Sequence, residues 1–310
     1  MNAHLPSPVV TVSMATCNSE LTVARAVTSV LNQDFSNLEL LVFDSQSSDQ
    51  TREILRSFAR RDRRIRLHLH EKRLPWTANA QLGLQLACGE FFMFLDGDDY
   101  VANNYLSQLI DRLKDESSIG AMGRLLHCNI EGQLLVNHPA FGRVFEFACA
   151  KHRRRRLHRM ILTPDVYGAV NTLYSLWRTS ELREVGLWTT EKERRDDDYL
   201  FCLRALSKGR IVTVSDTWIC RLIEPYTGPK VESRESVWLP EAEMRTSHRT
   251  QIVDWTFPYL VQIVRFIRND WRNLTLLLPV FVRMCVAIVA LPKRCVRIFT
   301  SMRNVRSSHG

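Results

Sequence analysis

The first hundred residues alternate between short apolar runs and amphipathic segments, and this alternation restricts the fold more than any other feature of the chain. Val9–Ala15 and Leu38–Phe43 are apolar runs that end in polar residues, which is typical of buried strands. Between them, apolar residues recur at the spacing of one helix face: Leu21, Ala24, Val27, Val30 and Leu31. A strand, a helix and a second strand in this order predict the start of a parallel sheet.

The same alternation continues along the chain. It predicts helices over Asp49–Ala59, Thr77–Ala87 and Asp196–Leu206, and strands over Arg66–His70, Phe91–Leu95 and Ile211–Val214. The middle, from about Gly120 to Tyr174, is irregular and allows no assignment. We therefore expect an α/β fold whose mixed, mostly parallel sheet is flanked by helices.

Aspartates follow two of the predicted strands directly. In open α/β sheets, ligands bind beyond the carboxyl ends of the strands, and Asp44 and Asp96 stand at two such ends. Asp96-x-Asp98, followed by Asp99, could hold a hard cation such as Mg²⁺ or Mn²⁺ that bridges a diphosphate. The alternative for this Asp-rich turn is a solvated loop or a helix N-cap.

Several segments, in a fixed order, resemble family 2 glycosyltransferases of the GT-A fold. They include the stretch from Val9 to Asp49, the Phe94-Leu95-Asp96-Gly97-Asp98-Asp99 run, and Asp197-Asp198-Tyr199 ahead of Leu203-Arg204. The resemblance extends from Val9 to Val214. It implies a Rossmann-like GT-A catalytic domain over residues 1–230, with a nucleotide-sugar half over 1–118 and an acceptor half over 119–230.

The resemblance also implies roles for single residues. Asp44 would accept a hydrogen bond from the nucleotide base, and Thr16, Asn18 and Ser19 would line the same pocket. Asp96 would contact the ribose or the metal, and Asp98 would bind the metal, Mn²⁺ or Mg²⁺.

Asp198, or its neighbour Asp197, falls at the position of the catalytic base in the resemblance. A sugar hydroxyl is a poor nucleophile until a base takes its proton, so a carboxylate opposite the leaving diphosphate would give single displacement with inversion. The alternative for Asp196–Asp198 is an N-cap followed by first-turn acids that the helix dipole favours.

The expected reaction moves a sugar from a nucleotide-sugar donor, such as a UDP- or dTDP-sugar, to a hydroxyl of a saccharide or lipid-linked acceptor. Synthesis of a surface polysaccharide or lipopolysaccharide is a plausible setting. The sequence departs from the family at Ser45-Gln46, at Gln81, at Asp197-Asp198 and after Arg221. The alternative is therefore a protein of the same fold that binds nucleotide sugars without turnover.

The net charge of +9 is concentrated at the C-terminus, where ten Lys and Arg but only two acids follow residue 248. The apolar stretch 274–291 is interrupted by Pro279 and Arg283. We expect residues 231–310 to form a helical extension with an in-plane anchor on an anionic membrane; the alternative is a helical hairpin that packs on the catalytic domain or forms a dimer.

A second basic cluster, Arg153–Arg156, suits either a solvated helix or the phosphate of a lipid-linked acceptor. Nucleic-acid binding would leave the aspartates unexplained, so we expect no nucleic-acid partner. The eight cysteines lack CxxC spacing and lie in apolar stretches, which predicts buried thiols. Together with an N-terminus that lacks the pattern of a signal peptide, they predict a cytoplasmic location on the inner membrane face.

Overall fold

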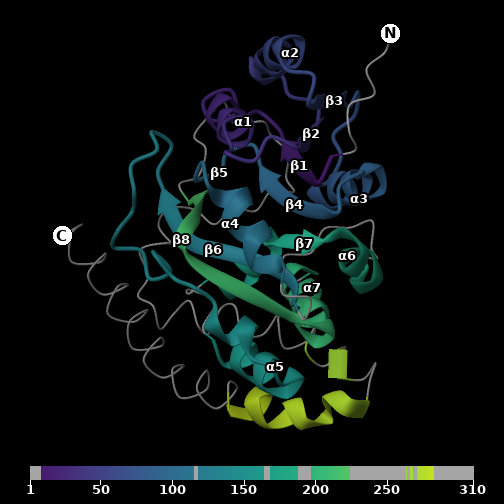
Figure 1. Ribbon diagram of the computed structural model, residues 1–310, viewed down its shortest axis with the longest axis vertical. Helices are drawn as coiled ribbons and strands as arrows, with labels where there is room; N and C mark the ends of the chain where they lie inside the picture. The colour runs from purple at the N-terminus through teal and green to yellow at the C-terminus, as the bar shows by residue number, and fades with distance from the viewer. Residues whose placement is uncertain are drawn as a thin grey trace, which may run out of the picture.

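The computed structural model describes residues 8–114, 118–163, 168–187, 197–223, 263, 266–267 and 271–282. Its centre is an eight-stranded sheet with the order β3-β2-β1-β4-β7-β6-β8-β5. Helices flank this sheet; the strands up to residue 96 build one end of it, and the strands from residue 100 onward build the other (Figure 1). The predicted α/β class and mixed sheet are confirmed.

The first half of the chain forms the parallel end of the sheet. The strands are β1 (Val10–Thr16), β2 (Leu38–Asp44), β3 (Ile65–Leu69) and β4 (Phe91–Asp96), and all of their pairings are parallel. The connecting helices are α1 (Val23–Leu31), α2 (Thr51–Arg61) and α3 (Trp76–Leu86). Each of these elements lies within two residues of the segment that the alternating pattern predicts.

The segment from residue 100 onward adds antiparallel pairs. Its strands are β5 (Tyr100–Val101), β6 (Ser118–Cys128), β7 (Leu176–Arg178) and β8 (Arg210–Leu222), and β7 joins β4 to β6 with both pairings antiparallel. Its α-helices are α4 (Tyr105–Leu113), α5 (Arg153–Leu162), α6 (Thr179–Val185) and α7 (Asp197–Lys208). Shorter 3-10 helices are η1 (Glu146–Cys149), η3 (Ala169–Tyr174) and η4 (Trp271–Leu276).

Three details differ from the sequence-based prediction. Leu21 is 64% exposed because α1 begins only at Val23, so the buried face of this helix includes Val23 and Ala26 rather than Leu21. β8 is 13 residues long, because it continues past the exposed Ser215 and Asp216, whose polarity ends the apolar pattern. The irregular middle contains the long strand β6 and the helix α5.

The prediction of buried thiols holds only in part. Cys128, Cys202 and Cys220 are buried, but Cys88 is exposed, and Cys17 and Cys149 are half-buried. Cys88 lies directly after α3, before β4 begins, at a surface connection. Apolar neighbours in the sequence therefore do not by themselves predict that a thiol is buried.

The stretch predicted as a membrane anchor is described only to residue 282. In the part of the chain that the structure describes, no helix has the length and apolar character required to cross a bilayer. The remainder of 274–291 and most of the predicted extension 231–310 lie outside the described residues.

Glu39 is a charged residue in the mostly apolar strand β2, and its hydrogen bonds and ion pair account for its burial there. Its Oε1 accepts hydrogen bonds from the Thr11 hydroxyl at 2.7 Å and from the Cys88 backbone N–H at 2.8 Å. Its Oε2 pairs with Arg66 Nη1 at 3.1 Å, at the edge where Arg66 reaches solvent. One buried carboxylate therefore ties β1, β2 and the loop before β4 together.

We predict that Glu39→Ala lowers the free energy of unfolding by about 1–3 kcal/mol, because the Thr11 hydroxyl and the Cys88 N–H lose their buried acceptor. Glu39→Gln keeps that acceptor oxygen and loses only the pairing with Arg66, so it should cost well under about 1 kcal/mol. Urea unfolding of the three proteins measures the difference. Equal losses in the two variants would contradict this explanation.

Candidate active site

The parallel strands bring the predicted donor residues to one edge of the sheet. In the register of β1 with β2, Thr16 lies opposite Asp44, and in the register of β1 with β4, Ala15 lies opposite Asp96. The carboxyl ends of three neighbouring strands therefore meet here. Asp44 and Asp96, which are 52 residues apart in the sequence, flank the end of the same central strand.

The loops after β1 and β2 are joined by hydrogen bonds. The Asn18 N–H donates to Ser47 Oγ at 2.8 Å, and Asn18 Oδ1 accepts from the Ser48 N–H at 2.9 Å. The Ser19 N–H donates to Thr51 Oγ1 at 2.7 Å. Asn18 has a φ of 51°, a left-handed conformation that asparagine tolerates better than most residues. The predicted residues Asn18 and Ser19 thus belong to one rigid network with the loop after Asp44.

Asp44 is completely buried at the end of β2. Its Oδ1 accepts from the Ser47 N–H at 3.2 Å and lies 2.5 Å from Arg52 Nε, and its Oδ2 accepts from the Ser47 hydroxyl. The guanidinium of Arg52 also donates to the backbone oxygen of His70. The side chain of Asp44 is therefore held in place by Ser47 and Arg52, and Oδ2 keeps acceptor capacity beyond its bond to Ser47.

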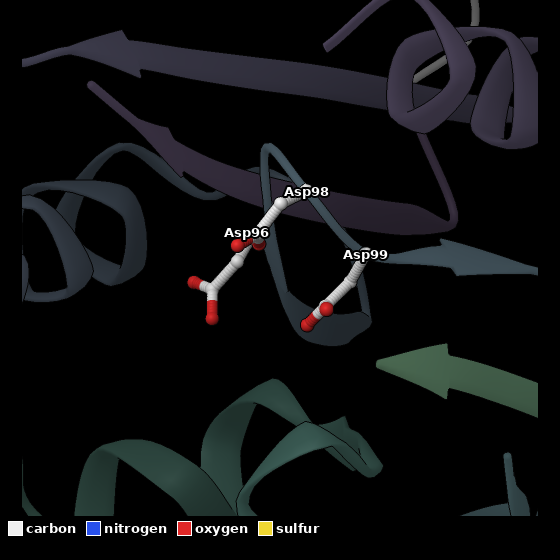
Figure 2. Close-up of side chains that lie close together, drawn as sticks. All are labelled: Asp96, Asp98 and Asp99. Carbon is white, nitrogen blue, oxygen red and sulfur yellow. The ribbon is translucent and has the colours of Figure 1, made fainter. Parts of the chain in front are cut away.

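Asp96, Asp98 and Asp99 gather on the turn between β4 and β5, as Figure 2 shows. One carboxylate oxygen of each can be chosen so that all three lie within 4.8 Å of one another. Gly97 allows this turn to pack on β1, since a Cβ at that position would lie 2.5 Å from Thr16 Oγ1. The alternative of a freely solvated loop is wrong, because Asp99 is fully buried and Asp96 is half-buried.

Asp96 is held by three side chains from distant parts of the chain. Trp76 Nε1 donates to its Oδ1 at 2.7 Å, and the Tyr174 hydroxyl donates to its Oδ2 at 2.7 Å. Arg221 Nη2 also donates to Oδ2, at 3.2 Å. Burial raises the pKa of Tyr174 well above its ordinary value, with a further contribution from the charge of Asp96. Tyr174 is therefore a hydroxyl donor at neutral pH.

Arg221 lies at the centre of this ion cluster. Its Nε is 2.5 Å from Asp99 Oδ2, its Nη1 donates to Asn171 Oδ1 at 2.9 Å, and its Cζ lies 3.8 Å from the centre of the Tyr174 ring. The Leu222 N–H donates to Asp99 Oδ1 at 3.0 Å. Burial alone would lower the pKa of Arg221, but the surrounding charges, Asp99 above all, raise it above its usual range.

The cluster carries more negative than positive charge. The pKa of Asp98 is raised to about 6, mainly by burial and next by the charge of Asp96, while Arg221 opposes the shift. Burial likewise raises the pKa of Asp99 well above its ordinary value. A divalent cation would relieve this excess, and carboxylate oxygens are the ligands that Mg²⁺ and Mn²⁺ prefer. The residues present therefore fit such a cation.

Asp198 lies in the first turn of α7 and is half-buried. Its charge contributes to the raised pKa of Tyr174, behind the larger effect of burial, so it lies within electrostatic range of the side chain that contacts Asp96. The backbone of Asp197 begins α7, and its side chain lies outside the described residues. The fold thus brings Asp198 to the same region as the acid cluster.

Four contributors to the site have no signal in the sequence patterns: Arg52, Trp76, Asn171 and Tyr174. Trp76 looks like an ordinary apolar residue at the start of a helix, and Tyr174 and Asn171 lie in the irregular middle. His127 is a further example, because it lies opposite Arg221 in the register of β6 with β8. The pKa of His127 is lowered to about 3, mainly by burial and next by His138 and Arg221. Its side chain is therefore neutral.

The family model of glycosyl transferase family 2 matches residues 11–171, a little over half of the chain. This segment contains Thr16, Asn18, Ser19 and Asp44, together with the aspartates after β4. The chain belongs to glycosyl transferase family 2.

Two bacterial relatives and one solved structure add detail. The chain is 36% identical over 110 residues to the GalNAc(5)-diNAcBac-PP-undecaprenol beta-1,3-glucosyltransferase of Campylobacter jejuni, and this match covers 35% of each chain. It is 37% identical over 110 residues to the UDP-Glc:alpha-D-GlcNAc-diphosphoundecaprenol beta-1,3-glucosyltransferase WfgD of Escherichia coli, covering 35% of this chain and 43% of that protein. The matches thus span less than half of each relative.

The solved structure is the mannosyltransferase PcManGT from Pyrobaculum calidifontis in complex with GDP-Man and Mn²⁺. It matches with a TM-score of 0.55 and 16% identity, over 94% of this chain and 76% of that one. At this identity the likeness concerns the fold, and it confirms the expected GT-A type.

We predict a strong energetic coupling between Arg221 and Asp99. Arg221→Met leaves a buried carboxylate without its cation, which should cost about 3–5 kcal/mol of unfolding free energy. Asp99→Asn keeps an acceptor for the Leu222 N–H and removes the unpaired charge, so the double variant should be more stable than the sum of the single losses by about 0.5–3 kcal/mol. Urea unfolding in EDTA measures the cycle, and strictly additive losses would contradict the coupling.

A second prediction concerns the raised pKa of Asp98. The folded state holds the Asp98 proton more tightly than the unfolded chain between the folded pKa of about 6 and the ordinary value of 3.8, so lowering the pH through this window stabilises the metal-free protein. Asp98→Asn removes the ionised form. The variant should therefore be more stable than wild type well above pH 6, and the difference should shrink as the pH approaches 3.8.

Urea unfolding in EDTA at several pH values measures this effect. Asp111→Asn is the matched control, because Asp111 is exposed on α4 and forms an ion pair with the exposed Lys114. Its stability relative to wild type should stay nearly constant over the same range. A pH-independent difference for Asp98→Asn would show that its charge does not strain the folded state.

Proposed function

We propose that this protein is a metal-dependent, inverting glycosyltransferase that moves a sugar from a nucleotide-sugar donor to a hydroxyl of a saccharide or lipid-linked acceptor. One observation carries the proposal: Asp44, the acid cluster after β4 and Asp198 gather around the carboxyl edge of the parallel strands. A glycosyl transfer of this kind needs a base-binding group, a counter-charge for the diphosphate and a proton acceptor.

In this proposal the nucleotide lies over the ends of β1 and β2. Asp44 Oδ2 accepts from an N–H of the base, as uracil or thymine offers, and Arg52 and Ser47 orient the side chain. Thr16, Asn18 and Ser19 line the same pocket. The E. coli relative takes its name from UDP-Glc, which supports a UDP-sugar or dTDP-sugar as the donor.

Asp98 and Asp96 would hold Mn²⁺ or Mg²⁺. When bound, the cation would neutralise negative charge that develops on the departing diphosphate. Asp98 is the better placed of the two, because both oxygens of Asp96 already accept hydrogen bonds from Trp76, Tyr174 and Arg221. Arg221 adds a permanent positive charge beside the same acids, and Asp99 fixes it there.

Asp198 acts as the catalytic base in this proposal, with Asp197 as the neighbouring alternative. The acceptor hydroxyl attacks the anomeric carbon, a new glycosidic C–O bond forms, and the C–O bond to the diphosphate breaks. The hydroxyl proton passes to the carboxylate, and the diphosphate leaves with the bonding electron pair. Asp198 is half-buried and lies within electrostatic range of Tyr174, which contacts Asp96, and this supports a place for it beside the donor site.

The acceptor and the setting follow from the relatives. Both are named for undecaprenol-linked diphosphate substrates, which supports a lipid-linked acceptor, a part in surface-polysaccharide synthesis and peripheral contact with the inner face of the cytoplasmic membrane. We keep the proposed division into a donor half over 1–118, an acceptor half over 119–230 and an extension over 231–310. The second candidate, a nucleotide-sugar-binding protein without turnover, is favoured by the departures at Gln81 and around Arg221.

Thermal unfolding with a panel of nucleotide sugars tests the donor site, with and without Mn²⁺. We predict that one nucleotide class raises the melting temperature of wild type by mass action, and that Asp98→Ala removes the part that depends on Mn²⁺. Asp198→Asn should keep the full stabilisation and lose transfer by a factor on the order of 100 or more.

Transfer is then measured with the stabilising donor and polyprenol-diphosphate-linked saccharides. Stabilisation without transfer in wild type would favour the second candidate. No stabilisation by any donor in folded protein, or an Asp198→Asn variant as active as wild type, would overturn the assignment of the site.

A further inference from the structure

The helix α5 and residues 271–282 lie side by side, although about 120 residues separate them in the sequence (Figure 1). A ring nitrogen of His158 is 2.9 Å from the Thr275 backbone oxygen, and Arg153 donates to Asn273 Oδ1. Asn273 in turn donates to the Phe266 backbone oxygen at 2.8 Å and is almost completely buried. The two segments therefore form one continuous surface at one end of the molecule.

The arginines of α5 divide into two groups. Arg156 is buried and donates to the backbone oxygens of Leu206, Ala150 and Lys151, and Arg153 donates to Ser207 Oγ at 2.7 Å. These two residues hold α5 on α7 and on its neighbours. They are consequently unsuited to the ligand-binding role that the sequence allowed for the whole cluster.

The remaining cations of α5 point outward. Arg154, Arg155 and Arg159 are exposed, and together with His158 they line a hollow of about 660 Å³. Burial lowers the pKa of His158, so the permanent charge of the hollow comes from the three arginines. Neither α5 nor the segment 271–282 contains an acidic residue. The charged side chains that these two segments contribute are therefore all positive.

Residues 277–282 are helical and apolar on both sides. Val280 and the preceding Leu276 are buried. The other side faces solvent: Leu277 is 53% exposed, Leu278 62%, Phe281 62% and Val282 42%. Contiguous exposed apolar side chains of this size mark a surface that binds something. These side chains follow directly on η4, which packs against α5, the helix that carries the outward arginines.

We propose that this face, formed by Arg154, Arg155, Arg159, Leu277, Leu278 and Phe281, docks on an anionic lipid bilayer. Apolar side chains enter the boundary between headgroups and acyl chains while arginines meet the lipid phosphates, and this combination is what an in-plane membrane contact requires. A second copy of the chain fits less well, because a symmetric interface would set the same arginines against each other. The inference rests on the proposed function, since a lipid-linked acceptor places the enzyme at a membrane.

Flotation of the full-length protein with lipid vesicles tests the proposal, using phosphatidylcholine with and without phosphatidylglycerol. Wild type should float with the anionic vesicles only, and salt should weaken the binding. The triple variant Arg154→Gln/Arg155→Gln/Arg159→Gln should lower the bound partition on the order of 100-fold, because each cation near an anionic surface contributes. Leu278→Ser/Phe281→Ser should lower it as well, even at low salt.

Matched controls remove the same groups elsewhere. Arg60, Arg61 and Arg63 are exposed on and after α2, at the opposite end of the molecule in Figure 1, and the triple Arg→Gln variant there should float like wild type. Leu21→Ser/Val136→Ser removes two apolar side chains that are 64% and 62% exposed, and should do the same. Equal losses in test and control variants would overturn the proposal, because net charge rather than this face would then decide binding.

Two further readouts separate the rival explanations. If Leu278→Ser/Phe281→Ser converts a dimer to a monomer in light scattering and leaves vesicle binding unchanged, the face joins two copies of the chain and the proposal is wrong. Donor-induced thermal stabilisation is measured on every variant and should stay at the wild-type value. If wild type shows no donor binding yet the vesicle results hold, the proposed function fails and the membrane face stands.

Discussion

The ion cluster around Arg221 joins segments that come together only in the folded chain. Asp96 and Asp99 follow β4, Tyr174 ends η3, and Arg221 lies near the end of β8. One guanidinium offsets the charge of buried carboxylates whose pKa values remain raised, so neutralisation is incomplete. A cluster without net charge would attract a cation only weakly. The same arrangement therefore stabilises the contact between the two halves of the sheet. It also leaves an excess of negative charge that a divalent cation would neutralise.

The donor side of the site is organised differently. Asp44 is satisfied by Ser47 and Arg52, and the loops after β1 and β2 are hydrogen-bonded to each other. Such a network has little freedom to lose when a nucleotide binds, so binding costs less conformational entropy. The acid cluster and the hydrogen-bonded loops meet at the end of β1, where Thr16 lies between Asp44 and the turn at Gly97. A base and a diphosphate of one ligand could thus be held by two sets of residues with different physical properties.

The sequence predicts the parallel part of the sheet well, because its strands are continuous apolar runs and the residues that follow them must lie at one edge. This pattern predicts that Asp44 and Asp96 lie at that edge. The roles of Trp76, Tyr174 and Arg221 cannot be predicted in this way. They depend on how α3, η3 and β8 pack across the sheet, and no local sequence pattern indicates that packing. Leu21 illustrates the opposite error: it fits the helical spacing, but it lies ahead of the first turn of α1 and faces solvent.

The proposed membrane face is mechanically connected to the proposed catalytic base through α7. Arg156 and Arg153 of α5 bind the last turn of α7, at Leu206 and Ser207, and Asp198 lies in its first turn. Eight residues of α-helix separate Asp198 from Leu206, a rise of about 12 Å. Because a helix of this length behaves as a rigid rod, docking through α5 would fix the height of Asp198 above the lipid phosphates. An acceptor whose diphosphate is anchored in the bilayer would then present its sugar hydroxyl at a defined distance from the base, so Arg153 and Arg156 would contribute to positioning without touching either substrate.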